Sequence, residues 1–200
     1  MKLKKEHLSK VYEGLAEKDE SFQYALKLVR ANTNGGNIWV IGSQVYKNLI
    51  NHYWGLPPNH YNKSLKDYDF LIESPQEEIR LPFFWRKTIN NFGNPKFHQI
   101  FGRMKIDFVP LDKVHSVNER RVSPSIENYL AGVPLNIHSI VYDTKNQTIE
   151  GEVGIQSLEQ KIVRVNNLQM AEDTARRYNI TINELIKKIA EKLSFQPEFI

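Results

Sequence analysis

The chain has 200 residues, 40% hydrophobic and 25% charged, with a formal net charge of +4. This is the composition of one globular domain, or of a core domain with a small appendage. The absence of cysteine excludes disulfides, iron–sulfur clusters, thiolate zinc sites and cysteine nucleophiles. No apolar run approaches the roughly 18–20 residues of a membrane helix, and the basic N-terminus lacks a signal-peptide pattern. We therefore expect a soluble cytoplasmic protein that makes no contact with a membrane.

Two amphipathic helices are predicted within the first 30 residues, because Leu8 and Phe22 each begin an apolar series at i, i+3, i+4 and i+7. Ser21 is the predicted N-cap of the second helix. The β-branched and aromatic run Ile38–Ile41 predicts a buried strand. The apolar pattern of Val45–Tyr53 predicts a helix directly after that strand.

The rest of the sequence predicts further strands and helices, and the last of these is a helix with a capping box. This mixture predicts an α+β fold, a small mixed sheet with helices packed on one face. We expect one compact domain with N-terminal helices over 1–36, a core over 37–165 and C-terminal helices over 166–200 packed on the core. The remaining predicted elements are strands at Asp67–Ile72, Lys96–Phe101 and Lys105–Leu111, helices at Phe83–Phe92, Ser123–Leu130 and Ile182–Leu193 (capped by Thr181 and Glu184), and a hairpin of Ile137–Tyr142 with Gln147–Glu150.

Positive charge is concentrated in the middle of the chain. From Arg80 to Arg121, nine Lys or Arg residues stand against three acids. Such a segment suits a polyanionic ligand, either a nucleic acid or a nucleotide. The alternative is a solvated basic surface. Arg86 and Lys87 in this segment, together with Arg103 near a predicted strand, are candidate contacts for the phosphates of an acceptor.

Three aspartates are the candidate catalytic and metal-binding residues. Asp67 and Asp69 are two residues apart on a predicted strand, so their side chains share one face of it. Asp107 lies on another apolar strand, on the face opposite Ile106 and Phe108, which we expect to be the open face. Three carboxylates together repel one another unless cations neutralise them, and such a set suits two Mg²⁺ ions. The alternative is that Asp67 merely begins its strand and that Asp69 is solvated.

A small-residue turn, Gly42-Ser43, joins the first predicted strand to the next helix. Backbone N–H groups and the positive end of the helix dipole at such a turn can bind phosphate. Taken alone, the pair also fits a simple helix cap at Ser43. Lys47 and Lys66 are candidate cations for neutralising a bound triphosphate.

In this order, Ile41-Gly42-Ser43, Asp67-Tyr68-Asp69-Phe70 and Ile106-Asp107-Phe108 resemble the DNA polymerase beta-like nucleotidyltransferase superfamily. The resemblance implies that Gly42 and Ser43 grip a triphosphate. It also implies that Asp67, Asp69 and Asp107 hold the metal ions, with Asp107 helping to activate the incoming hydroxyl.

The sequence also resembles the head domain of poly(A) polymerases and tRNA CCA-adding enzymes. Glu172-Asp173-Thr174-Ala175-Arg176 is similar to their Glu-Asp-x-x-Arg motif, which implies that Asp173 and Arg176 read the incoming base. The alternative is an ordinary i, i+4 salt bridge between Glu172 and Arg176. The chain departs from the family where it has Tyr46-Lys47 instead of Arg-Asp, and Gly132-Val133-Pro134 instead of Arg-Arg-Asp.

Two other features have competing interpretations. The triplet Phe83-Phe84-Trp85 is suited either to stacking on bases or to packing in the core. His138 lies on an apolar run and is interpreted as a packed core residue rather than a catalytic base.

We expect Mg²⁺-dependent transfer of a nucleoside monophosphate from an NTP to a hydroxyl, as on an RNA end, with release of pyrophosphate. One alternative is a non-catalytic nucleotide-binding or nucleic-acid-binding module of the same fold. Another is a toxin-type nucleotidyltransferase that acts on tRNA or on a protein hydroxyl. The sequence leaves the choice of NTP, the acceptor and the oligomeric state open.

Overall fold

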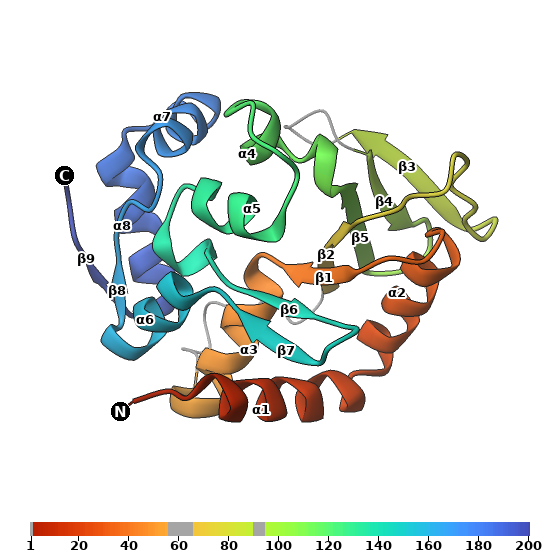
Figure 1. The fold of residues 1–200 in the computed structure, drawn as a ribbon, viewed down its shortest axis with the longest axis horizontal. Coiled ribbons are helices and arrows are strands. Elements are labelled where there is room, and N and C mark those ends of the chain that lie inside the picture. Colours follow the sequence, from red (N-terminus) through yellow and green to blue (C-terminus); the bar gives the residue numbers. More distant parts are fainter. Residues whose placement is uncertain (1, 56–65, 90–94) are drawn as a thin grey trace.

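The computed structural model describes residues 2–55, 66–89 and 95–200. A seven-stranded sheet with strand order β3-β4-β5-β2-β1-β6-β7 runs through the molecule (Figure 1). Within it β2 and β5 pair in parallel and the other neighbours pair antiparallel, so the predicted mixed sheet is confirmed. The strands are β1 (Ile38–Ile41), β2 (Lys66–Ile72), β3 (Trp85–Ile89), β4 (Pro95–Gln99), β5 (Met104–Pro110), β6 (Val141–Asp143) and β7 (Thr148–Glu150), with a separate parallel pair of β8 (Ile162–Val163) and β9 (Gln196–Pro197).

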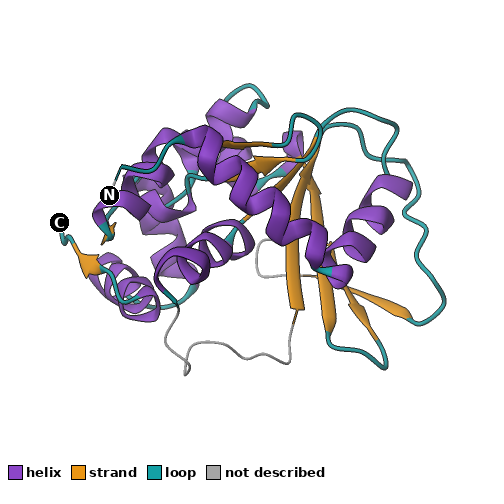
Figure 2. Ribbon diagram, turned by 90° about the horizontal axis from the view of Figure 1, so that it is seen from below, coloured by secondary structure: helices purple, strands orange, loops and turns teal. Residues whose placement is uncertain are grey.

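Helices surround this sheet and gather at the end of the molecule that carries both termini, while strands project at the opposite end (Figure 2). Among the described residues, no helix is long and apolar enough to cross a membrane. The α-helices are α1 (Lys5–Lys18), α2 (Glu20–Ala31), α3 (Ser43–Trp54), α4 (His115–Asn118), α5 (Ile126–Gly132), α6 (Glu152–Gln160), α7 (Leu168–Arg177) and α8 (Ile182–Leu193), and the short 3₁₀ helices are η2 (Leu111–Lys113) and η3 (Asn136–His138).

The main core lies between one face of the sheet and the helices α1, α2 and α3. The ring of Phe22 on α2 lies 5.8 Å from the ring of Tyr68 and 6.1 Å from that of Phe70, both on β2. Strand alternation gives Tyr68, Phe70 and Ile72 the same face, and all three are buried. This face of β2 is therefore closed by α2.

A second, smaller core covers part of the opposite face. Leu71 of β2 and Val109 of β5 pack there in a cluster with Tyr129 of α5 and Val117 of α4. Leu71 shares its face with Asp69 and Asp67 by strand alternation. The helices α4 and α5 therefore cover this face near the ends of β2 and β5, and the aspartates lie nearer the beginnings of these strands.

Helix ends follow local chemistry, with one correction. The capping box of α8 is confirmed, since Thr181 and Glu184 each bond the other's backbone N–H. The cap of α2 is Asp19 rather than the predicted Ser21, because Asp19 Oδ1 accepts from the backbone N–H groups of Ser21 and Phe22. Ser21 is instead within the first turn of the helix.

One other predicted element is wrong, and a second begins later than expected. The helix expected at Phe83–Phe92 is a turn at Phe83 and Phe84 followed by strand β3, and residues 90–92 lie outside the described residues. As an edge strand, β3 buries only Trp85, so it lacks the alternating pattern that would have marked it. The predicted hairpin is confirmed as β6–β7, but it begins at Val141. The chain before it turns in η3, where Asn136 Oδ1 accepts from two backbone N–H groups.

Candidate active site

The parallel register of β2 and β5 brings the candidate aspartates together. Asp69 is the direct partner of Asp107, and Asp67 is the partner of Lys105. All three aspartates therefore share one face of the sheet, as predicted. Asp107 is 7% exposed, so the expectation that it stands on an open surface is wrong: the face is shared, but its side chain is buried.

Burial and mutual repulsion define the electrostatics of these carboxylates. Burial, together with the negative charges of Asp67 and Asp107, raises the pKa of Asp69 to about 7, against the opposing effect of Lys96 and Lys47. A cation bound nearby would favour the ionised form of Asp69, so the cation and the carboxylate would stabilise each other. The site therefore carries more negative charge than its own side chains neutralise.

Lys96 on β4 is the site residue that sequence reasoning missed. It is the cross-strand partner of Asp107, and its Nζ lies 3.1 Å from Asp67 Oδ1 and 3.4 Å from Asp107 Oδ2. Burial alone would lower the pKa of Lys96, but the three aspartates outweigh burial and raise it. The ammonium group thus bridges two of the three carboxylates. Only the β4–β5 register identifies Lys96, and the local sequence does not specify that register.

The Gly42 turn lies against Asp69 at the start of α3. Gly42 has φ 68° and ψ −149°, a region that is essentially restricted to glycine. A Cβ at this position would lie 3.0 Å from Asp69 Oδ2. Ser43 is the first residue of α3, and no acid stands in the first turn. The turn therefore places the positive end of a 12-residue helix beside the aspartates, as phosphate binding requires.

The two candidate lysines have different positions. Lys47 on α3 interacts electrostatically with Asp67 and Asp69, although burial and the nearby Lys192 of α8 lower its pKa overall. Lys66 instead donates to Asp19 Oδ1 at 2.9 Å. The structure therefore brings Lys47 towards the aspartates and holds Lys66 at the beginning of α2.

The candidate acceptor contacts are also separated. Arg86 is the partner of His98, whereas Lys87 is the partner of the buried Phe97. Alternation therefore places Arg86 on the face of the aspartates and Lys87 on the face of the main core. Arg103 is exposed just before β5, and its carbonyl accepts from the backbone N–H of Lys66 at 2.9 Å.

The candidate base-reading pair lies on α7. Asp173 Oδ2 accepts from Arg177 Nε at 2.7 Å and lies 2.5 Å from His115 Nε2 of α4. Burial would raise the pKa of Asp173, but the hydrogen bonds from Arg177 and His115 outweigh it, so the pKa is lowered. Arg176 is exposed. The structure thus joins Asp173 to His115 and Arg177, which sequence reasoning missed.

His138 is packed, in agreement with its interpretation as a core residue. Its ring centroid lies 5.9 Å from that of Tyr46. Burial, together with the positive charge of Lys47, lowers the pKa of His138 to about 4. The imidazole is therefore neutral at physiological pH.

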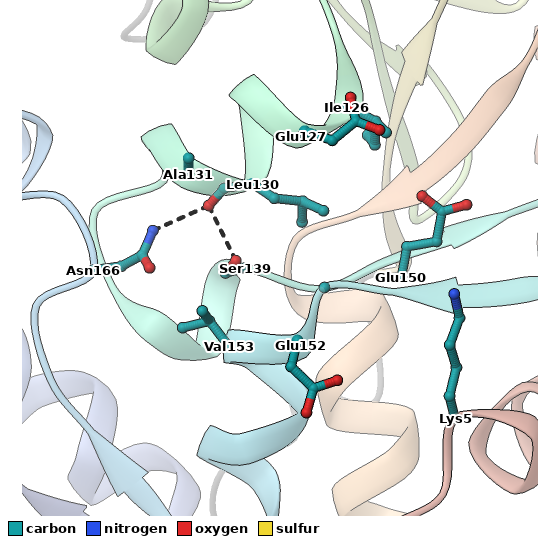
Figure 3. A pocket seen from close by; sticks show the side chains of 11 residues that line it. Lys5, Ile126, Glu127, Leu130, Ala131, Ser139, Glu150, Glu152, Val153 and Asn166 are labelled. Atoms are coloured by element: carbon teal, nitrogen blue, oxygen red, sulfur yellow. Dashed lines mark hydrogen bonds between the residues drawn. The ribbon is translucent and has the colours of Figure 1, made fainter.

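A cavity of about 540 Å³ lies apart from the aspartates, between α5 and the β7–α6 junction (Figure 3). Glu127, Glu150 and Glu152 line it, with Lys5 on one side. Burial and the charge of Asp143 raise the pKa of Glu150. A wall of carboxylates repels phosphate, so this cavity does not suit a nucleoside triphosphate.

No protein-family model and no curated protein matches the sequence. Solved structures match its fold. A CCA-adding enzyme with CTP matches with a TM-score of 0.61 and 17% identity, over 94% of this chain and 43% of that one. The Thermotoga maritima CCA-adding enzyme complexed with tRNA-CCA matches with a TM-score of 0.61 and 17% identity, over 96% and 42%. A CCA-adding enzyme with ATP matches with a TM-score of 0.57 and 16% identity, over 90% and 40%.

The class of fold follows from these matches: the chain has a nucleotidyltransferase-like fold. In its particular form the fold is related to that of CCA-adding enzymes, which confirms the resemblance drawn from the sequence. The chain spans about two fifths of the length of these structures, whose covered shares are 43%, 42% and 40%.

Proposed function

We propose that the protein is a Mg²⁺-dependent nucleotidyltransferase that transfers a nucleoside monophosphate from an NTP to a hydroxyl of RNA. The observation that carries this proposal is the meeting of three aspartates with the Gly42 turn. Asp69 is the register partner of Asp107, and its Oδ2 lies against Gly42 at the N-terminus of α3. This arrangement pairs a group of carboxylates with a phosphate-binding helix end.

The donor chemistry of the site fits Mg²⁺. Carboxylate oxygens are its preferred protein ligands, and a bound cation would offset the burial and the neighbouring carboxylates that raise the pKa of Asp69. Within the described parts of the chain, however, no three acidic or histidine side chains converge closely enough to hold an ion as they stand. Binding would therefore require Asp67, Asp69 and Asp107 to draw together and Lys96 to withdraw from Asp67 or Asp107.

The reaction has a simple balance of bonds. The acceptor hydroxyl gives its proton to water and its oxygen bonds to the α-phosphorus. The bond from that phosphorus to the bridging oxygen breaks, and this oxygen leaves with pyrophosphate. When bound, Mg²⁺ lowers the pKa of the acceptor hydroxyl and neutralises phosphate charge. Gly42 and Ser43 bind the β- and γ-phosphates through backbone N–H groups, and Lys47 adds a positive charge. Asp107 orients the attacking oxygen from its buried position beside Asp69.

The same proposal assigns Asp173 and Arg176 to reading the base of the NTP, with their guanidinium and carboxylate facing a base edge. For this role Asp173 must give up its bond to Arg177 or share it. The CTP, ATP and tRNA bound in the similar structures support an NTP substrate and an RNA acceptor.

One observation favours a second candidate function. The ammonium of Lys96 sits between Asp67 and Asp107, where it offsets charge that catalysis would assign to a metal ion. A lysine in the place of a metal ion is expected of a non-catalytic module of the same fold that binds nucleotide or nucleic acid.

The decisive experiment is incubation of the protein with each α-labelled NTP, Mg²⁺ and total RNA, followed by a denaturing gel and a protein blot. Mg²⁺-dependent label in RNA that Asp69→Asn abolishes is the expected result. Label in protein instead identifies a protein hydroxyl as acceptor. NTP binding without any transferred label overturns the proposal in favour of the non-catalytic module.

A further inference from the structure

Basic side chains form a continuous row across the site face of the sheet. Asp67 on β2 is the register partner of Lys105 on β5, Lys105 is the partner of His98 on β4, and His98 is the partner of Arg86 on β3. Directly paired residues of neighbouring strands project from the same face. The row Lys105–His98–Arg86 therefore leads from Asp67 to the edge of the sheet over three strand spacings, roughly 14 Å.

The neighbouring residues show that this face is built differently from the other. The adjacent row of paired residues, on the opposite face of the sheet, consists of Tyr68, Ile106, Phe97 and Lys87. The first three are at most 1% exposed and belong to the main core. Lys87 thus stands at the end of a row of core residues, whereas Arg86 stands at the end of the row of basic side chains.

Exposed apolar side chains lie directly beyond the end of this row. The backbone N–H of Ile100 donates to the carbonyl of Phe84 at 2.8 Å, just past the last β3–β4 pair, Trp85 with Gln99. Phe84 is two residues from Arg86 along the chain, and Ile100 is two residues from His98. Phe84 is 42% exposed and Ile100 is 45% exposed. Phe84 therefore offers an accessible ring at the Arg86 end of the row.

We propose that the row Lys105–His98–Arg86, with Phe84 beside it, binds the single-stranded end of the RNA acceptor and leads it to the aspartates. This proposal rests on the proposed function, because it names the path of that reaction's acceptor. The row complements a phosphodiester backbone in charge, and the His98 ring can donate a hydrogen bond to phosphate. An aromatic side chain beside a basic groove binds unpaired bases by stacking, which a duplex does not allow. The occupant is therefore a single strand.

Adjacent residues on opposite faces supply a matched pair of variants. Arg86→Glu and Lys87→Glu change the net charge equally, so any general electrostatic effect is the same for both. The affinity for a short unstructured RNA, fluorescent at its 5′ end, is measured by anisotropy over a series of salt concentrations. The buffer holds EDTA and no NTP. Melting curves of both variants confirm that they fold.

Arg86→Glu is expected to reduce the slope of log affinity against log salt by about 0.7 or more, the value for one phosphate contact on a single strand. Lys87→Glu is expected to leave the slope unchanged. Phe84→Leu is expected to weaken binding about fivefold or more without changing the slope, since stacking of a base contributes about 1–3 kcal/mol. Duplex RNA is expected to bind more weakly than the single strand.

Equal slopes for Arg86→Glu and Lys87→Glu overturn the proposal, as does duplex RNA that binds as tightly as single-stranded RNA. Undetectable RNA binding by the wild type at low salt also overturns it. Because the assay contains neither Mg²⁺ nor NTP, a protein that transfers no nucleotide can still confirm the row. An active transferase with an unchanged Arg86→Glu slope overturns the row alone.

Discussion

Asp69 and Asp107 are direct partners in the parallel pair of β2 and β5, and Asp69 also lies against the Gly42 turn. Asp107 is buried and Asp69 is partly buried, and two such neighbouring carboxylates destabilise a fold unless a cation or a proton compensates them. The protein retains them where they repel each other. Such placement is typical of a functional site rather than of a structural one.

Asp69→Asn is predicted to keep or raise the melting temperature at pH 8 without divalent ions. The reason is that burial and the neighbouring carboxylates raise the pKa of Asp69 to about 7, so its ionised form is unfavourable at this pH. Asp19→Ala is the control: Asp19 caps α2 and accepts from Lys66, and its loss should cost about 0.5–2 kcal/mol. A large drop for Asp69→Asn would show that this carboxylate is structural.

Lys96→Met is predicted to lower the melting temperature in EDTA, because Asp67 and Asp107 lose the ammonium between them. Added Mg²⁺ should then raise the melting temperature of the variant more than that of the wild type, because no side chain competes for the carboxylates. Thermal scans with and without Mg²⁺ measure both effects, with the exposed Lys87→Met as control. Equal Mg²⁺ shifts in variant and wild type contradict a metal site at these aspartates.

Gly42→Ala is predicted to destabilise the protein by about 1–3 kcal/mol and to weaken NTP binding. The cause is the backbone conformation at Gly42, together with a Cβ 3.0 Å from Asp69 Oδ2. Gly35→Ala separates the two causes, because Gly35 also has a positive φ, of 82°, but a Cβ there meets no atom within 4 Å. Denaturant titration and NTP titration of both variants provide the measurement. NTP affinity that falls equally in both speaks against phosphate binding at Gly42.

Asp173→Asn is predicted to lose stability at pH 7 and to match the wild type in strong acid. The folded-state pKa of Asp173 is lowered, because hydrogen bonds from Arg177 and His115 outweigh burial. A lowered pKa stabilises the fold above the unfolded-state value of about 4, and this contribution is lost as the pH falls through the folded-state value. Unfolding measured from pH 7 to pH 2 tests the sign. A constant difference across this range contradicts the assignment.

Arg176→Ala is predicted to relax the preference among ATP, CTP, GTP and UTP by about 1–3 kcal/mol, while stability stays nearly constant. Arg176 is exposed on α7, so its loss removes little packing. Transfer rates with each NTP, for wild type and variant, give the preference. Unchanged ratios of the rates among the four NTPs would show that Arg176 does not read the base. Helix α7 would then contribute only to stability, through Asp173.

Much of the site could be predicted from local sequence. Alternation along a strand places Asp67 and Asp69 on one face, and the Gly42 turn follows from an apolar strand that runs into a helix. These features depend on neighbours in the chain. The structural matches confirm the fold they indicated.

The remainder depends on register, which local periodicity does not specify. Lys96 reaches Asp67 and Asp107 only because β4 pairs with β5 at that position. The pairing of Asp173 with His115 joins residues that lie 58 positions apart. Strand β3 was missed because an edge strand buries one residue and shows no alternation.

The most direct test of nucleotidyl transfer uses one NTP in two forms, labelled at either the α- or the γ-phosphate, and measures where each label goes. With Mg²⁺ and RNA, the α-label is predicted to enter the RNA and the γ-label to leave as pyrophosphate. Asp69→Asn and Asp107→Asn should abolish both, whereas Asp112→Asn, an exposed aspartate of η2, should not. Entry of the γ-label into the product, or α-label transfer that persists in Asp69→Asn, would contradict transfer at these aspartates.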